Sequence, residues 1–410
     1  MRPDRRCWSN ISPTRRILSG PGICLTCKHY CIRQIALLHH QPTGDFQILS
    51  LPHTPSHDCN GKVSDPMKDF AGKIAVITGG GTGMGRELAR QLVAEGCNVA
   101  MCDISADAMA ETKRLCEAER LPQGLRVTTH VADVSIEDQL KRFRDEIAER
   151  QATDKIHLLF NNAGIGGGGS LFTSTREQWE RTFNICWGGV YLGVRTFLPM
   201  LLKADEGHIV NTSSVNGFWA SIGPGASHTG YSAAKFAVKG FTEALINDLR
   251  LNAPYIKCSV VMPGHIGTSI MSNSRKVQYG TDSDRMSEIE IAQTRVRLTV
   301  AGVDASKMSD EDVRATVAER ARSFLEDAPM TAAQAARIIL DGVKAERWRI
   351  LVATTPTGST SGCGKRRNAP MSPSFTRALH KRWVGGSDRF ASRRQPHAAK
   401  RSPGFVADFA

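Results

Sequence analysis

The sequence predicts an α/β fold in a single domain, with a doubly wound parallel sheet of about seven strands and helices on both of its faces. Two patterns predict it. Short apolar runs alternate with segments of helical periodicity from residue 73 to residue 353, which is typical of βαβ units. A glycine-rich turn, Gly79–Gly85, joins the first apolar run to the first helical segment. Because the runs are uniformly apolar, we expect the sheet to be buried on both faces.

Seven apolar runs are predicted strands because they are short and bounded by turn residues. They cover residues 74–78, 98–102, 126–131, 156–160, 208–212, 256–262 and 349–353. Between them, apolar residues recur three and four positions apart, which predicts helices. These cover residues 86–95, 106–119, 135–151, 175–202, 231–251 and 332–345, and residues 269–330 form a long mixed segment.

Three of these helices carry capping signals. Ser105 can cap the second helix, and two pairs, Ser135 with Asp138 and Thr175 with Gln178, have the spacing of a capping box. A capping side chain bonds to backbone N–H groups that the first turn leaves without partners. We therefore expect helices to begin at these positions.

Both ends of the chain differ in composition from the middle. Residues 1–66 and 354–410 are rich in Pro, Ser and Arg and lack periodicity, so we predict two extensions, disordered or non-native, around a folded domain at 67–353. Residues 1–66 could instead be a targeting leader, since some leaders are rich in Arg and Ser. We favour an extension outside the fold, because Met67 stands directly before the first strand.

The basic charge of the chain is confined to its ends. The formal net charge is +13, of which residues 1–66 carry +4 and residues 354–410 carry +9, so the middle is neutral. A neutral domain gives no electrostatic reason to expect nucleic acid or an anionic membrane as a partner. No run approaches the roughly 20 apolar residues that span a bilayer.

The eleven cysteines also divide between the ends and the middle. Five precede residue 67, and those of the middle are scattered within apolar runs, as buried free thiols in a reducing compartment would be. We expect a cytoplasmic protein, and organellar import through residues 1–66 stays open. Cys24, Cys27, Cys31 and His29 have a spacing that can hold zinc, but no second ligand pair follows, so we predict no metal site.

The turn after the first strand has the glycine spacing of a phosphate-binding loop. Gly79, Gly83 and Gly85 follow the strand and open the first helix. Glycines let the backbone approach a pyrophosphate, and the start of a helix offers unpaired N–H groups and the positive end of its dipole. The alternative is a plain glycine-rich turn, which the flanking strand and helix disfavour.

Asp103 ends the second strand, 18 residues after Gly85. Its carboxylate can accept hydrogen bonds from the hydroxyls of an adenosine ribose and would repel a 2′-phosphate. No Arg or Lys stands beside it, which favours NAD over NADP. An aspartate that only caps the next helix is the competing interpretation.

Tyr231 and Lys235 are spaced to lie on one face of a predicted helix, one turn apart. A neighbouring ammonium favours the phenolate and lowers the pKa of the phenol from its ordinary value of about 10. The pair is therefore a candidate proton donor and acceptor near neutral pH. Taken alone the spacing is a weak signal, because Tyr191 and Arg195 have it too.

Five motifs together resemble the short-chain dehydrogenase/reductase family. In chain order they are Thr78-Gly79-x-x-x-Gly83-x-Gly85, Asn161-Asn162-Ala163-Gly164, Ser213-Ser214, Tyr231-x-x-x-Lys235 and Pro263-Gly264. The resemblance covers about residues 70–353 and implies a Rossmann-type dehydrogenase domain. It also implies reversible hydride transfer between a nicotinamide cofactor and a secondary alcohol or ketone.

The resemblance implies a role for each matching residue of the catalytic set. Tyr231 is the implied general acid and base, and Lys235 the residue that binds the nicotinamide ribose and lowers the pKa of the phenol. Ser214, in preference to Ser213, is implied to hold the substrate oxygen. Asn184, in the middle of the helix predicted over 175–202, is implied to anchor a proton-relay water, with a satisfied core amide as the alternative.

The resemblance also implies a set of cofactor-binding residues. They are Thr78, Gly79, Gly83, Met84, Gly85, Asp103, Asp133, Val134, Asn161, Ala163, Gly164, Tyr231, Lys235, Pro263, Gly264 and Thr268. Of these, Asp133 and Val134 are implied at the adenine and Thr268 at the carboxamide. His265 has no implied role, and we expect it on the surface of a loop.

These motifs do not identify the substrate. Residues 269–330 are predicted to form a lid, and Phe218, Trp219 and Trp187 are apolar candidates for the surroundings of the pocket. Such a pocket suggests a hydrophobic, alicyclic or steroid-like alcohol or ketone. Ser214 and Tyr231 are 17 residues apart, a few more than is usual for the family, so the loop before Tyr231 should alter the pocket wall.

Two other functions stay open at this stage. One is a lyase or isomerase that uses bound NAD without net redox change. The other is a non-catalytic dinucleotide-binding regulator whose basic ends bind a partner, which the complete set of Ser214, Tyr231 and Lys235 argues against. The resemblance further implies a homodimer or homotetramer formed through the helices at 175–202 and 231–251.

Overall fold

The computed structural model describes residues 67, 69–118, 124–167, 169–220, 227–300 and 302–353. The extensions predicted at 1–66 and 354–410 lie outside the described residues, and so does the cysteine motif between Cys24 and Cys31.

A parallel sheet of seven strands forms the centre of the described residues, in the order β3-β2-β1-β4-β5-β6-β7. The strands are β1 (Ile74–Thr78), β2 (Asn98–Asp103), β3 (Val127–Val131), β4 (Leu158–Asn161), β5 (Gly207–Thr212), β6 (Ile256–Pro263) and β7 (Arg349–Val352). The order of the strands reverses between β1 and β4, and ligands bind at such a switch point, beyond the carboxyl ends of the strands. The predicted doubly wound α/β fold is confirmed.

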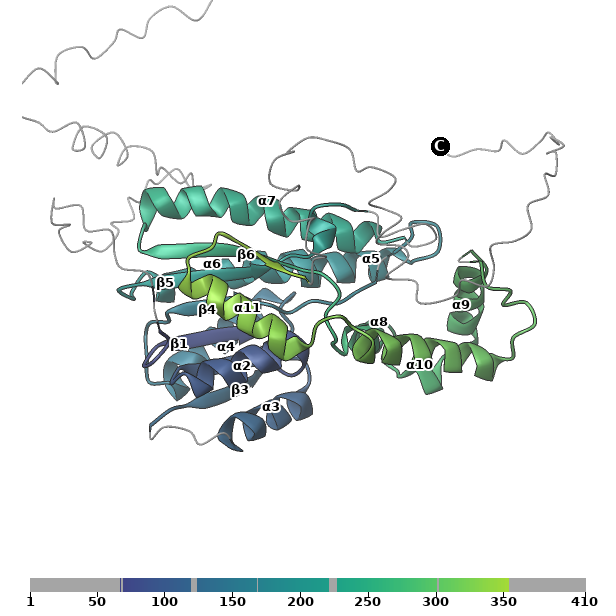
Figure 1. Cartoon of the computed structure of the whole chain (residues 1–410), viewed down its shortest axis with the longest axis horizontal. Helices are drawn as coiled ribbons and strands as arrows, with labels where there is room; N and C mark the ends of the chain where they lie inside the picture. The colour runs from purple at the N-terminus through teal and green to yellow at the C-terminus, as the bar shows by residue number, and fades with distance from the viewer. Residues whose placement is uncertain are drawn as a thin grey trace, which may run out of the picture. The chain divides into compact units, whose positions relative to one another are not determined.

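Helices cover both faces of the sheet, as Figure 1 shows. One face carries α2 (Gly83–Ala94), α3 (Ala106–Ala118) and α11 (Ala332–Lys344); the other carries α4 (Glu137–Arg150), α6 (Gly189–Leu201) and α7 (Thr229–Asn252). Within β1, Ala75 and Ile77 pack into the core of the first face and Val76 into that of the second. The strands are uniformly apolar because both of their faces are buried.

The helix predicted over 175–202 consists of three segments. It begins with α5 (Arg176–Phe183), whose capping box of Thr175 and Gln178 is confirmed. A π-helical turn, η1 (Asn184–Gly188), follows and leads into α6. Such turns inside α-helices are frequent at functional sites, and this one changes which side chains point inward.

Two other helix starts differ from expectation. The capping box predicted at Ser135 is wrong, because α4 begins after Ile136 and the Ser135 hydroxyl donates to the Asp133 carboxylate instead. The first helix, α2, begins at Gly83, three residues earlier than predicted. The glycine loop therefore supplies the first turn of that helix. Ser105 caps α3 as expected, since its hydroxyl accepts from the Ala108 N–H at 3.2 Å.

The mixed segment 269–330 folds into α8 (Ile270–Tyr279), α9 (Glu288–Val300) and α10 (Asp310–Glu326). These helices lie together to the right of the strands in Figure 1. They share a small apolar cluster around Met286, Ile291 and Val313, and a largely buried ion pair of 2.8 Å joins Arg275 of α8 to Glu290 of α9. Short 3-10 turns, η2 (Val215–Gly217) and η3 (Ser283–Arg285), complete the described elements.

Candidate active site

The glycine loop is packed so tightly that side chains do not fit at two of its positions. A Cβ on Gly85 would lie 2.0 Å from the Gly79 carbonyl oxygen, and a Cβ on Gly79 would lie 2.8 Å from Cα of Ala163. Gly83 has a φ of 54°, which favours glycine. The loop therefore presents bare backbone, and the N–H groups of the first turn of α2, at the carboxyl end of β1.

A cleft of about 400 Å³ opens beside this loop. Nine of the predicted cofactor-binding residues line it: Gly79, Gly83, Met84, Asp103, Asp133, Val134, Ala163, Gly164 and Thr268. The lining also includes residues that were not predicted to bind the cofactor, among them Thr82, Asn162, Arg181, Ile185 and Asn273. Backbone donors at a helix start and apolar walls fit a nicotinamide dinucleotide.

The Asp103 carboxylate is held in place by two backbone donors. One oxygen accepts from the Gly81 N–H at 3.0 Å and the other from the Ser105 N–H at 3.1 Å. Each oxygen keeps a further lone pair that can accept from ribose hydroxyls. Arg86 lies behind the loop and donates to the Gly81 carbonyl at 2.7 Å, but it does not line the cleft.

Thr78 and Asn161 lie behind the cleft wall. The Thr78 hydroxyl accepts from the N–H groups of Asn162 and Ala163, each at 3.0 Å. Asn161 is 1% exposed and its amide donates to Asn211 at 2.8 Å. Asn161 therefore supports the sheet. It was also predicted to line the cofactor site, but the residue that lines the cleft is its neighbour Asn162.

Gly85, Pro263 and Gly264 are also absent from the cleft lining. The Gly264 N–H donates to the Val352 carbonyl at 2.8 Å, which fixes the turn after β6. That turn leads to Thr268, whose methyl carbon would lie 3.0 Å from a Cβ on Gly83. These residues shape the cleft from behind and bring Thr268 against the glycine loop.

Lys235 and Tyr231 lie one turn apart in the first part of α7, as predicted. Lys235 is 3% exposed, and its ammonium donates to the Thr212 carbonyl at 2.9 Å. The ammonium is 5.5 Å from the centre of the Tyr231 ring and lies beside Gly164, a lining residue of the cleft. Lys235 thus connects the phenol to the wall of the dinucleotide cleft.

The pKa of the Tyr231 phenol is raised above its ordinary value, contrary to the expectation from its spacing with Lys235. Burial raises the pKa most, the Lys235 charge lowers it, Cys186 raises it, and a hydrogen bond with the Ser214 side chain lowers it. The ammonium has the expected effect, but burial outweighs it because an apolar environment disfavours the charged phenolate. The phenol is protonated at neutral pH in this state.

The two serines at the end of β5 have different surroundings. The buried hydroxyl of Ser213 donates to the Lys235 carbonyl at 2.7 Å, a contact within the fold. Ser214 bonds to the Tyr231 phenol, and its hydroxyl accepts from the Asn216 N–H at 3.1 Å. The structure therefore brings Ser214 and not Ser213 to the phenol.

Asn184 is exposed at the first position of the π-helical turn. An exposed amide cannot be the satisfied core amide that was the alternative, and the role of Asn184 at a relay water stays a prediction. Cys186, two residues further on, is the buried residue beside the site: its thiol donates to the Ile165 carbonyl at 3.1 Å and it influences the Tyr231 phenol. The π-helical turn, which no sequence signal marked, sets this arrangement.

Two histidines lie near the site and the lid. His265, expected on the surface of a loop, lies half-buried in the loop after β6: its Nε2 is 2.8 Å from the Phe324 carbonyl, and its ring packs 4.3 Å from that of Phe324. It thereby ties the turn after β6 to α10. His228, at the start of α7, lies with its ring 6.4 Å from the ring of Tyr231.

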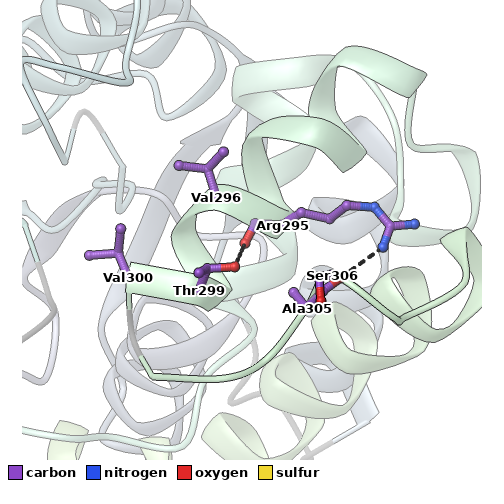
Figure 2. Close-up of a pocket in the computed structure, with 6 residues that line it drawn as sticks. All are labelled: Arg295, Val296, Thr299, Val300, Ala305 and Ser306. Atoms are coloured by element: carbon purple, nitrogen blue, oxygen red, sulfur yellow. Dashed lines mark hydrogen bonds between the residues drawn. The ribbon is translucent and has the colours of Figure 1, made fainter.

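A second hollow, of about 260 Å³, lies on the lid between the end of α9 and the following loop, as Figure 2 shows. The Arg295 guanidinium there donates to the Ala305 carbonyl at 3.0 Å, and the Thr299 hydroxyl donates to the Arg295 carbonyl at 2.9 Å. Exposed Val296 and Val300 form its apolar side. None of the predicted site residues lies in it.

Comparison with known proteins decides the family. Residues 73–278 match the family model described as short chain dehydrogenase. The chain belongs to this family. It is an NAD(P)-dependent oxidoreductase, and its motifs carry the resemblance that the sequence predicted.

The relatives and solved structures agree with this assignment. The chain is 36% identical over 222 residues to "Putative oxidoreductase SadH" of Mycobacterium tuberculosis, a match over 54% of this chain and 76% of that protein. It is 33% identical over 231 residues to "Levodione reductase" of Leifsonia aquatica, over 56% and 82%. A short-chain dehydrogenase structure from Burkholderia phymatum in complex with NAD has a TM-score of 0.52 and 30% identity, over 69% of this chain and 89% of that one.

Among the described residues no helix is long and apolar enough to cross a membrane. The same residues contain no group of three or more His, Cys, Asp or Glu side chains that could hold a metal ion.

Proposed function

We propose that this oxidoreductase interconverts a secondary alcohol and a ketone with NAD as its cofactor, and that Tyr231 is the general acid and base. The observation that carries the proposal is the convergence of Lys235 and Ser214 on the Tyr231 phenol, directly beside the cleft wall at Gly164. A binding module has no need of these three groups at one point.

The nicotinamide supplies or accepts the hydride when it is bound, and the protein supplies the proton chemistry. In the reducing direction, the protonated Tyr231 phenol donates its proton to the oxygen of the carbonyl. The Ser214 hydroxyl donates a hydrogen bond to the same oxygen and fixes its position. In the oxidising direction Tyr231 takes the proton from the alcohol, and the Lys235 charge favours the phenolate that must form first.

The cofactor-binding residues that line the cleft divide by position. Gly79, Gly83 and Met84 would hold the diphosphate at the start of α2, since this is where backbone N–H groups are unpaired. Asp133 and Val134 line the part of the cleft that suits an adenine, Gly164 lines the part beside Lys235, and Thr268 lies against Gly83. The cleft volume lies in the ordinary range for small-molecule sites.

The preference for NAD rests on Asp103. Its carboxylate lines the cleft with two oxygens fixed by backbone donors. A 2′-phosphate at that point would meet a negative charge, while ribose hydroxyls would meet acceptors. The lining residues on this side, Ile104, Ser105 and Ala108, include no cation.

The substrate we propose is a hydrophobic ketone or secondary alcohol. Support comes from a relative named as the reductase of levodione and from the aromatic pair Trp179 and Phe183, stacked at 5.3 Å on α5. The Trp179 indole donates to the Thr229 hydroxyl at 3.1 Å, two residues before Tyr231. These rings therefore lie beside the start of the catalytic helix.

Trp187 belongs to a different surface. It packs at 5.3 Å from Phe241 and at 6.0 Å from Tyr191, on the outer side of α6 and α7. Tyr191 and Phe236 are 41% and 43% exposed. We propose that these helices form the interface of a homodimer or homotetramer, since exposed aromatic residues are typical of interfaces.

We also propose that residues 67–353 are the complete catalytic domain of a cytoplasmic protein. The five described cysteines are free and buried, which supports a reducing compartment. Removing residues 1–66 and 354–410 should leave the oxidoreductase activity intact.

A substrate screen tests the function. The full chain is mixed with aliphatic and alicyclic secondary alcohols and NAD, or with the matching ketones and NADH, and absorbance follows the nicotinamide. We expect one NADH for each alcohol oxidised. Conversion of a substrate without change in NADH would identify a lyase or isomerase instead, and NADH binding without turnover of any substrate would favour a regulator.

A further inference from the structure

We propose that Asn273, on the lid helix α8, is a further cofactor-binding residue whose side-chain amide contacts the diphosphate of the dinucleotide. The proposal rests on the proposed function, because it needs the cleft beside the glycine loop to hold a dinucleotide. It assigns one half of the diphosphate site to the lid and the other half to the glycine loop.

The side chain of Asn273 lies beside the start of α2. Its Nδ2 donates to the Thr82 hydroxyl at 3.0 Å, although 191 residues separate the two in sequence. Thr82 is the residue at the start of α2, directly before Gly83, and its hydroxyl does not cap that helix. The amide of Asn273 therefore lies where the unpaired N–H groups of α2 begin, and it lines the cleft.

The start of α2 has the chemistry of an anion-binding site. The start of a helix attracts anions through its free N–H groups and its dipole. A primary amide has two N–H bonds, and Thr82 takes only one of those of Asn273. The second is available to a phosphate oxygen in the cleft, and a hydrogen bond to a charged acceptor is stronger than one to a neutral group.

The lid helix is held firmly enough to present this amide. The Ser274 hydroxyl accepts from the Gly166 N–H at 2.7 Å, and Gln278 donates to the Thr182 hydroxyl at 2.8 Å. Consecutive turns of α8 are thereby fixed to the loop after β4 and to α5. The amide of Asn273 needs no movement of the helix to meet a bound diphosphate, so little ordering cost opposes the contact.

Helix α8 also brings a cation, Lys276, to the cleft. Lys276 is one turn beyond Asn273 and also lines the cleft, with its ammonium 3.2 Å from the carboxylate of Asp282 at the surface. Ile270 and Val277 line the cleft from the same helix. The face of α8 toward the cleft thus combines a donor, a positive charge and apolar surface, which matches a dinucleotide.

The competing interpretation is that Asn273 only fastens the lid to Thr82. The two interpretations differ in what a change at Thr82 does. If Asn273 only fastens the lid, removing either partner has the same effect. If Asn273 binds the diphosphate, Thr82→Val frees the amide for that contact, and Asn273→Ala removes it.

The experiment measures dissociation constants of NADH and of ADP-ribose for the full-length protein, by nicotinamide fluorescence and by competition. We expect Asn273→Ala to weaken both by about tenfold, the size of one hydrogen bond to a charged group. Asn273→Asp should weaken both further, because it sets a carboxylate beside the phosphates. Ser272→Ala, on the same helix with a hydroxyl bonded back to Ser269, is the matched control and should change binding by less than about twofold.

Thr82→Val should weaken the binding of NADH clearly less than Asn273→Ala does. Equal losses in the two variants, or wild-type affinity in both Asn273 variants, would overturn the proposal. Thermal unfolding is measured for every variant, and Asn273→Ser replaces Asn273→Ala if the latter does not fold, with the same expected loss. Wild-type protein that binds neither NADH nor ADP-ribose would contradict the proposed function itself, which separates the two failures.

Discussion

The Lys235 ammonium lies 5.5 Å from the centre of the Tyr231 ring and donates to the Thr212 carbonyl at 2.9 Å. The strand end at Thr212 thus fixes the charge, and the helix fixes the phenol relative to it. Burial raises the pKa of Tyr231 while Lys235 and Ser214 lower it. The effect of burial on the pKa of the phenol is therefore opposed by the effects of Lys235 and Ser214. A change in any of the three should alter proton transfer measurably.

Tyr231→Phe should bind NADH normally and lose turnover by about 10²- to 10⁴-fold, the usual contribution of a general acid or base. The ring is kept and only the proton donor is removed. Tyr191→Phe is the matched control, because Tyr191 has Arg195 at the same spacing but is 41% exposed on α6. Full activity of Tyr231→Phe in a steady-state assay would exclude the proposed mechanism.

Lys235→Met should move the pH dependence of alcohol oxidation to higher pH. Oxidation needs the phenolate, and Lys235 lowers the pKa of the phenol, so its removal raises that pKa further and the activity rises only at more alkaline pH. The pH profile of kcat/KM measures this. Lys239→Met, one turn further along and paired at 3.1 Å with Glu243, should leave the profile in place; an equal shift in both variants would contradict the assignment.

Ser214→Ala and Ser213→Ala should differ in their effect on turnover. Ser214 bonds to the phenol and its hydroxyl also accepts from the Asn216 N–H, so its loss should lower kcat by about tenfold or more and also cost about 1 kcal/mol of stability. The Ser213 hydroxyl donates to the Lys235 carbonyl at 2.7 Å inside the fold, and its loss should cost about 1–3 kcal/mol of stability. Urea unfolding and steady-state kinetics on both variants decide, and a reversed pattern would assign the substrate contact to Ser213.

Asp103→Ser should reduce the preference for NAD over NADP. The change removes a negative charge from the point where a 2′-phosphate would lie and keeps a ribose hydrogen bond. The ratio of kcat/KM for the two cofactors should fall by about tenfold, one unit of charge repulsion at an exposed cleft. Asp107→Ser, in the exposed first turn of α3, is the control, and a wild-type enzyme that already prefers NADP would contradict the proposal.

His208 should make the protein sensitive to acid. Burial lowers the pKa of His208 to about 3, whereas an unfolded histidine titrates near about 6.5. Between these values the unfolded chain binds a proton that the folded one does not, so stability falls as the pH falls through that window. Relative to pH 7, the loss at pH 4.5 should reach roughly 3 kcal/mol.

His208→Gln isolates this contribution. Its unfolding free energy, from urea titrations at pH 7 and pH 4.5, should fall less than that of the wild type by about the same amount. The carboxylates and the other buried histidines, His130 and His157, titrate in both proteins. Identical acid losses in the two proteins would show that His208 is not the cause.

The strands and the helices that pack on the sheet were predictable because burial leaves a periodic signal in the sequence. The uniformly apolar run of β1 indicates a strand buried on both faces, and the helical spacing of the apolar residues of α2 indicates the face that packs on the sheet. The lid was not predictable in the same way, since α8 to α10 bury little apolar surface and their pattern is weak. Only their capping box at Ser309 has a clear local signature.

The candidate site was predictable where its parts are local. Tyr231 and Lys235 share one helix, and Gly79, Gly83 and Gly85 share one turn, so spacing alone brings them together. The exposure of Asn184 was not predictable from the sequence, because it follows from the π-helical turn, which leaves Asn184 exposed and buries Cys186 instead. Asn161 and Asn162 alternate across a strand end, and no motif decides which of them faces the cleft.

By itself, the sequence determined the family, the doubly wound sheet, and the residue types that hydride transfer requires. Those follow from periodicity and from spacings within single elements, which the backbone geometry of helices and turns makes fixed. The tertiary structure alone decided the sign of the Tyr231 pKa shift and the contact between Asn273 and Thr82. Both depend on burial and on groups far apart in the chain, and desolvation is a property of the whole surrounding fold.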